Sequence, residues 1–171
     1  MKLRSQDRNL AKSKSNHDRD LRKYTSIETM IEHLHAEAAS FGVTIVTKIK
    51  TSLRSSKVST AYYKQIRVRH DWNDITHASQ ATTLAHEMVH VRQWRKYGRL
   101  GFGARYVLSQ RFRWAMEMQA RTEQVIAMQC LGMGTQEFVD KQAERMLDVY
   151  KLGRIRDDVR RYTPEILGQF C

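Results

Sequence analysis

The spacing of apolar and polar residues predicts one helix at the start of the chain, between residues 26 and 40. Apolar residues recur there every three or four positions, as they do on one face of an amphipathic helix. This apolar stripe consists of Ile27, Met30, Ile31, Leu34 and Ala38. Thr25 and Glu28 have the spacing of a capping box, and Gly42 stands where a C-cap glycine belongs. We therefore expect the helix to run from about Ser26 to Ser40.

The pattern then changes to a period of two, which is typical of strands. Apolar and polar residues alternate over Val43–Lys50, and the Ser/Thr/Lys-rich stretch Thr51–Ser56 indicates a turn. Val58–Tyr63 and Gln65–Arg69 follow as further expected strands, before a polar connection at residues 70–74. These segments predict a small sheet that is mostly antiparallel.

Helical periodicity returns in the second half of the chain. One helix should begin between Thr76 and Gln80 and end before Gly98. The stretch Arg99–Tyr106 contains two glycines and is expected to be a loop. The remaining expected segments are a helix over Leu108–Leu131, a helix from Thr135 to Gly153, a short basic segment over Arg154–Arg161, and a tail after Pro164. Together these elements predict an α+β fold with helices on one face of the sheet.

Length and charge add a domain division and a class of partner. The 171 residues suit one domain, here 25–171, preceded by a basic arm at 1–24 that we expect to be flexible. The formal net charge is +12, and residues 47–113 hold fourteen Lys/Arg against three Asp/Glu. The positive electrostatic field of these residues favours an anionic partner, such as an acidic protein or a nucleic acid.

The segment His86-Glu87-Met88-Val89-His90 has the form H-E-x-x-H. On a helix, His86 and His90 lie one turn apart on the same face and can bind one metal ion together. Zinc lowers the pKa of a bound water to about 7, and Glu87 is placed to take the proton of that water as a general base. The motif therefore indicates metal-assisted hydrolysis, with one Zn²⁺ per chain.

A catalytic zinc site needs a third protein ligand. The extended motif that would supply a histidine has lysine at that position, Lys96. Glu117 is the first acidic residue after Glu87 and stands in an apolar stretch, where an unpaired carboxylate would be costly. We expect Glu117 to be the ligand, with Glu123 as its rival. The alternative for Glu117 is an ion pair with Arg113 or Arg121, four residues away on either side.

These residues carry a resemblance to a known group of enzymes. His86-Glu87-Met88-Val89-His90 followed by a helical Glu117 resembles the gluzincin zinc metallopeptidases. Residues 84–98 are similar to small metallopeptidases of phages and prophages, and the spacing to Glu117 resembles that of ImmA/IrrE-like proteases. The resemblance covers roughly residues 43–131. It implies a minimal zincin fold and a peptide substrate that adds a strand to an edge strand such as Gln65–Arg69.

The cellular setting follows from what the sequence lacks. Two cysteines, Cys130 and Cys171, are too few for a disulfide framework and suggest free thiols. The first residues contain no apolar signal core, and no apolar run is long enough to span a bilayer. We expect a cytoplasmic protein, in a host cytoplasm or a virion if the gene belongs to a phage.

Several further residues are candidates for a role in function. A group that stabilises the transition-state oxyanion is expected, and the candidates are His70, His77, Tyr106 and Arg113. Basic residues interleaved with Tyr62 and Tyr63 could instead contact a phosphate backbone. These basic residues are Lys48, Lys50, Arg54, Lys57, Lys64, Arg67 and Arg69. The alternatives to a peptidase are therefore a nucleic-acid-associated protein, or a structural particle component, that retains a zincin fold.

Overall fold

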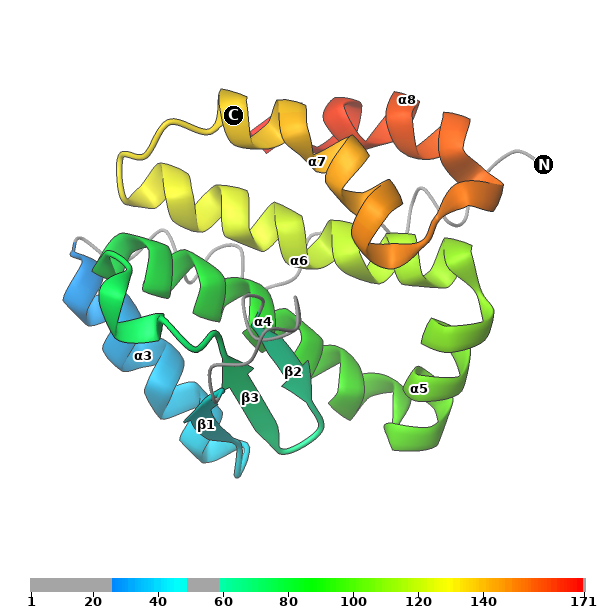
Figure 1. Cartoon of the computed structure of the whole chain (residues 1–171). Helices are drawn as coiled ribbons and strands as arrows, with labels where there is room; N and C mark the ends of the chain where they lie inside the picture. Colours follow the sequence, from blue (N-terminus) through cyan, green and yellow to red (C-terminus); the bar gives the residue numbers. More distant parts are fainter. Residues whose placement is uncertain (1–25, 49–58, 171) are drawn as a thin grey trace.

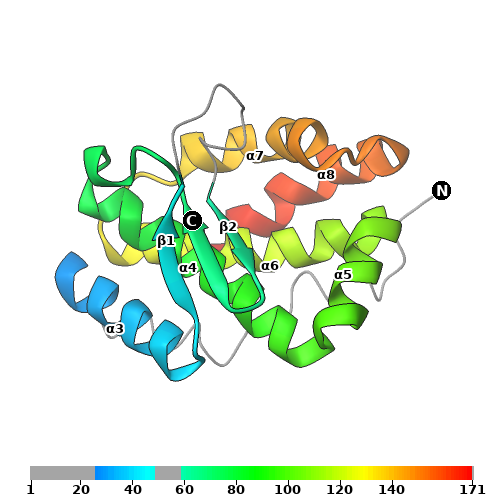
Figure 2. The same ribbon diagram turned by 60° about the horizontal axis from the view of Figure 1, so that its bottom comes forward.

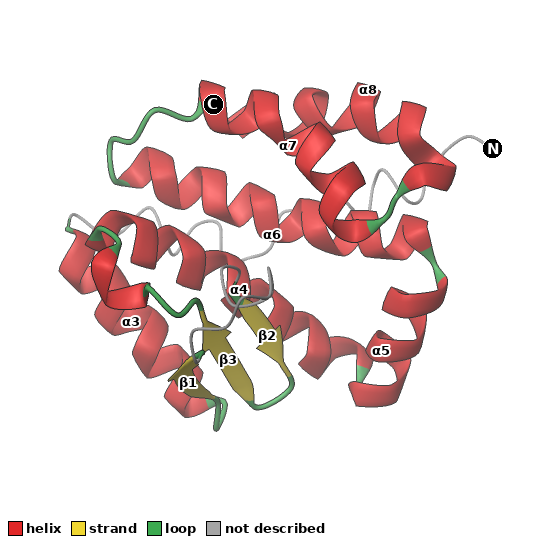
Figure 3. Ribbon diagram, viewed as in Figure 1, coloured by secondary structure: helices red, strands yellow, loops and turns green. Residues whose placement is uncertain are grey.

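A small sheet packed with helices makes up the part of the chain that this computed structural model describes, residues 26–48 and 59–170 (Figures 1 and 3). The strands are β1 Thr44–Thr47, β2 Thr60–Tyr62 and β3 Gln65–Val68. The helices are α3 Ile27–Ser40, α4 His77–Tyr97, α5 Arg99–Leu108, α6 Gln110–Cys130, α7 Gln136–Tyr150 and α8 Arg156–Leu167. Short 3₁₀ turns lie at Trp72–Asp74, Gly153–Ile155 and Gly168–Phe170. The α+β prediction is confirmed at this level.

Helix α3 forms close to the expected bounds. Its N-cap is Ser26, whose side chain accepts from the Thr29 amide, whereas Thr25 lies outside the described residues. Gly42 has a φ of 66°, a left-handed conformation that favours glycine. The buried residues Met30, Leu34 and Ala38 confirm the predicted apolar stripe.

The sheet is mixed, which corrects the expectation of a mostly antiparallel one. Its strand order is β1-β3-β2, with β1 parallel and β2 antiparallel to β3. The two-residue turn at Tyr63 and Lys64 forces β2 and β3 to run antiparallel, whereas the longer path from β1 to β3 permits parallel pairing. The expectation that Gln65–Arg69 is an edge strand was also wrong, because β3 lies in the centre and β2 lies at an edge.

Two segments expected to be irregular are helices. The expected loop after Gly98 is helix α5, in which Phe102 packs against Trp94 with ring centroids 4.6 Å apart. This packing outweighs the low helix propensity of its glycines. The expected basic segment and tail form helix α8, which continues through Pro164 to Leu167. Its buried stripe of Val159, Thr163, Ile166 and Leu167 was hidden by the charged residues between them.

Helices α4 and α6 lie side by side in the centre of the molecule (Figures 1 and 2). One apolar cluster joins them to α3 and the sheet, and a second joins them to α5, α7 and α8. A partly buried ion-pair group also connects three helices, because Arg92 of α4 binds Glu37 of α3 and Glu123 of α6. Within the described ranges, no helix is both long and apolar enough to cross a membrane.

Candidate metal centre

The H-E-x-x-H segment lies in the middle of α4 and is buried. Ala85 and Met88 face the core on one side, which directs His86 and His90 towards α6 on the other. The two imidazole rings have centroids 4.9 Å apart and are nearly perpendicular. Consequently, both side chains meet the same point on the neighbouring helix.

Glu117 of α6 occupies that point. Its Oε2 lies 3.7 Å from Nε2 of His86, and its Oε1 lies 3.4 Å from Nε2 of His90. One ligand atom from each of the three side chains lies within 4.8 Å of the others. Glu117 is only 1% exposed, and its Oε2 has no hydrogen-bond partner among the described residues. Two imidazoles and one carboxylate are the donor set of catalytic zinc sites, so these residues fit a zinc ion.

Glu123, the rival ligand, lies outside this cluster. It is buried on another side of α6 and receives a hydrogen bond of 3.3 Å from Arg92. The ion-pair alternative for Glu117 is not realised, because the guanidinium groups of Arg113 and Arg121 bind other partners. The choice of Glu117 over Glu123 in the sequence therefore agrees with the geometry.

Two further side chains orient these ligands. The Gln93 Oε1 lies 2.9 Å from Nδ1 of His90, while the Gln93 Nε2 donates to the carbonyl of Met116 and to Gln119. This arrangement fixes the Gln93 amide so that His90 donates from Nδ1 and keeps the lone pair of Nε2 for a metal. On the other side, the Tyr106 hydroxyl donates to Oε1 of Glu117.

Replacing Gln93 with leucine should weaken zinc binding by about 10- to 100-fold, the effect usual for the loss of a partner that orients a ligand. The measurement is competition with a chromophoric chelator. Gln80→Leu is the matched control, because Gln80 is on the same helix but donates to the Trp72 carbonyl, away from the site. Equal zinc affinities in the two variants would contradict the role of Gln93.

The protonation states of His86 and His90 determine how many protons a metal ion must displace when it binds. Burial lowers the pKa of His86, and the positive charges of Arg121 and His90 lower it further. Burial also disfavours the cationic form of His90, but the Glu117 carboxylate outweighs burial and raises the pKa of His90 to about 9. In the metal-free protein near neutral pH, the His86 imidazole is therefore neutral, whereas the His90 imidazole is protonated on both nitrogens and positively charged.

Zinc affinity should therefore rise by about tenfold per pH unit between pH 6.5 and 8.5. The sign follows from the raised pKa of His90, because below pH 9 each zinc ion must release the His90 proton. Calorimetric titration in buffers of different ionisation enthalpy should detect about one released proton at pH 7.5. A zinc affinity that stays constant over this pH range would contradict the assignment.

Glu87 borders an open cavity beside the cluster. The cavity has a volume of about 700 Å³, and His86, His90 and Glu117 are also among its lining residues. Burial raises the pKa of Glu87 to about 7, against the influence of His90 and of the Ala61 backbone. Strand β2 and the preceding Ser59 form one wall. The opposite walls are mainly apolar and include Trp94, Phe102, Val107 and Val149.

The four candidates for oxyanion stabilisation have different positions. Tyr106 lines the cavity and donates to Glu117. Arg113 donates to the backbone carbonyls of Tyr106, Val107 and Tyr150, so its hydrogen-bonding groups are engaged in holding α5 and α7 against α6. Among the described residues that line this cavity, neither His70 nor His77 occurs.

Tyr150 is a site residue that the sequence did not indicate. It ends α7, lines the cavity and accepts a hydrogen bond of 3.3 Å from Arg121. Burial and the nearby Glu117 carboxylate raise the pKa of the Tyr150 hydroxyl, so it stays protonated and able to donate. No motif marks this position, because only the packing of α7 on α6 brings it to the cluster.

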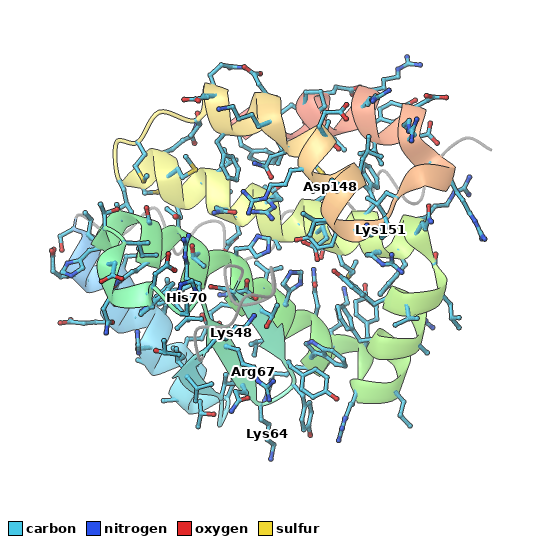
Figure 4. The ribbon with its side chains drawn as sticks, viewed as in Figure 1. Lys48, Lys64, Arg67, His70, Asp148 and Lys151 are labelled. Carbon is cyan, nitrogen blue, oxygen red and sulfur yellow. The ribbon has the colours of Figure 1, made fainter. Side chains whose placement is uncertain are left out.

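The candidate anion-binding residues are spread over the sheet. Lys64 lies at the turn between β2 and β3, whereas Arg67 lies further along β3 and donates to the Gln65 side chain, and Lys48 follows β1 (Figure 4). Tyr62 and Tyr63 beside them are 50% and 40% exposed. Arg69 forms a bidentate ion pair with Asp71. Lys50, Arg54 and Lys57 lie outside the described residues.

Comparison with known proteins adds no assignment. The chain matches no protein-family model, no curated protein and no solved structure.

Proposed function

We propose that this protein is a zinc-dependent peptidase of the gluzincin type. The observation that carries the proposal is the buried cluster of His86, His90 and Glu117 at the wall of an open cavity, with Glu87 beside it. A purely structural metal site would be closed by a fourth protein ligand. Among the described His, Cys, Asp and Glu side chains, only these three come together, which leaves a position for substrate.

The roles of the residues follow from their positions. His86, His90 and Glu117 would hold zinc, which supplies a Lewis acid for water and for a peptide carbonyl. Glu87 lines the cavity and acts as the general base that takes a proton from water and later delivers it to the leaving amine. Tyr106 and Tyr150 both line the cavity near Glu117, so they are the candidate hydroxyl donors to the developing oxyanion.

The shape of the cavity fits an extended peptide. Strand β2 forms one wall, and in the described part of the sheet it pairs on one side only, with β3. A substrate would therefore pair with the edge of β2, where the Ala61 backbone also binds Glu87, in the place that the sequence assigned to Gln65–Arg69. The apolar walls suit an apolar substrate side chain next to the cleaved bond.

The test uses the purified full chain and a mixture of peptides derived from a digested proteome. Cleavage should be lost on removal of metal by a chelator and return on addition of about one equivalent of zinc. Zinc-loaded protein that cleaves no peptide or protein would reject the proposal.

Nucleic-acid association is the second candidate, favoured by the exposed rings of Tyr62 and Tyr63, the second of which lies 5.8 Å from the Lys64 ammonium group. It predicts binding of single-stranded oligonucleotides that weakens steeply with salt, measured by fluorescence anisotropy. Unchanged anisotropy at low salt would reject this candidate and leave the peptidase proposal intact.

A further inference from the structure

A second cavity adjoins the first on the far side of the motif. Its volume is about 290 Å³, and both cavities are lined by Ser59, His86, Glu87 and Tyr150. The two cavities are therefore neighbouring compartments that share His86 and Glu87 in their walls.

The chemistry of the second compartment differs from that of the first. Its polar lining includes Arg121 and Arg145, together with Ser79, Thr82 and Arg69, whose charge is balanced by Asp71. Among its described lining residues, Glu87 is the sole carboxylate. A compartment with several cations and hydroxyl groups attracts an anion, whereas the first compartment attracts apolar groups.

Arg121 is the innermost of these cations and follows Glu117 by one turn of α6. Its side chain donates to Oε1 of Gln124 at 2.7 Å and to the Tyr150 hydroxyl at 3.3 Å. Arg121 is 7% exposed, and its Nε has no hydrogen-bond partner in the described part of the chain. Both acceptors are neutral, and neutral groups compensate the burial of a guanidinium charge only in part. Arg121 therefore has hydrogen bonds but no carboxylate ion pair of the kind that usually accompanies a buried arginine.

The charges of the cluster do not supply that carboxylate. With a dication bound, the charges of Glu87 and Glu117 together balance the metal, and the positive charge of Arg121 is left over. Arg121 and Arg145 line the same cavity as His86 and Glu87, so both guanidinium groups lie beside the proposed reacting centre.

We propose that the second compartment binds a carboxylate of the substrate, with Arg121 as the anchoring cation and Arg145 at its rim. This inference depends on the proposed peptidase function and gives it a substrate class: peptides with an acidic residue on one side of the cleaved bond and an apolar residue on the other. The carboxylate could be an aspartate or glutamate side chain, or the C-terminus of the peptide. Both present the planar pair of oxygens that a guanidinium binds with two hydrogen bonds.

The test measures binding, so it does not require turnover. Peptide hydroxamates, which bind an accessible zinc ion, are prepared with a glutamate or a glutamine on either side of the hydroxamate. In a further pair of hydroxamate probes, one member has a free C-terminal carboxylate and the other has an amidated C-terminus. Calorimetry with zinc-loaded wild-type protein should show that one carboxylate-bearing probe binds about 10- to 100-fold more tightly than its neutral counterpart. The pair that shows the difference identifies the source of the carboxylate.

The preference should disappear in Arg121→Gln and fall by a smaller factor in Arg145→Gln, which changes a residue at the exposed rim and keeps the test valid if the buried variant is unstable. Arg105→Gln is the matched control, because it removes an exposed charge that lines neither cavity. Equal binding of charged and neutral probes to wild type would overturn the subsite and leave the peptidase proposal standing. Failure of every hydroxamate to bind zinc-loaded protein would overturn both.

Discussion

Replacing Glu87 with glutamine should reduce peptide hydrolysis by about 10²- to 10⁴-fold while zinc binding is retained. The glutamine side chain fills the same buried position between the two cavities but cannot accept a proton. His86, His90 and Glu117 are unchanged, so the metal should still bind. The measurements are the cleavage rate of the best peptide from the mixture and the zinc content of the same preparation.

The control for Glu87→Gln is Glu144→Gln, which neutralises a carboxylate that pairs with Arg160 on the surface. This control should keep the wild-type rate. Wild-type cleavage by Glu87→Gln would assign the proton transfer to another residue, whereas loss of zinc from that variant would show that Glu87 helps to hold the metal.

Glu117→Gln should reduce zinc affinity by more than about 100-fold, beyond the loss expected when only an orienting partner such as Gln93 is removed. The amide carries no charge to offset the metal, and two imidazoles alone make an incomplete site. Elemental analysis of protein purified without added metal should give about one zinc per wild-type chain and almost none in the variant.

Glu123→Gln is the matched control, because it alters a second buried glutamate on the same helix. Glu123 binds Arg92 instead of the cluster, so this variant should keep its zinc and lose stability, by about 2 kcal/mol. Thermal unfolding separates the two effects. If Glu123→Gln lost zinc and Glu117→Gln kept it, the assignment of the third ligand would be wrong.

The ligand residues could be predicted from the sequence because each depends on local spacing. His86 and His90 need only one turn of helix, and that helix ends before Gly98 as expected. Glu117 was predicted from the cost of an unpaired carboxylate in an apolar stretch, and its distances to both histidines agree. The zinc ion and the reaction stay predictions until they are measured.

The residues around the ligands could not be predicted, because they depend on packing between distant segments. The glycines of α5 suggested a loop, yet Phe102 packs on Trp94 and the resulting helix places Tyr106 against Glu117. The strand assigned to substrate was wrong for a similar reason. Sequence alternation identifies strands, but it does not give their order in a sheet.

The shortness of β2 has a consequence for how the protein avoids self-association. An exposed edge strand is a template on which other chains aggregate, and proteins limit this risk by keeping such strands short. Strand β2 has three residues, Thr60–Tyr62, so it offers too few backbone groups to hold another chain by itself. A peptide would bind stably to β2 only if its side chains also filled the two cavities next to this strand. The same three residues on which we propose that a substrate docks would thus discourage fibril growth.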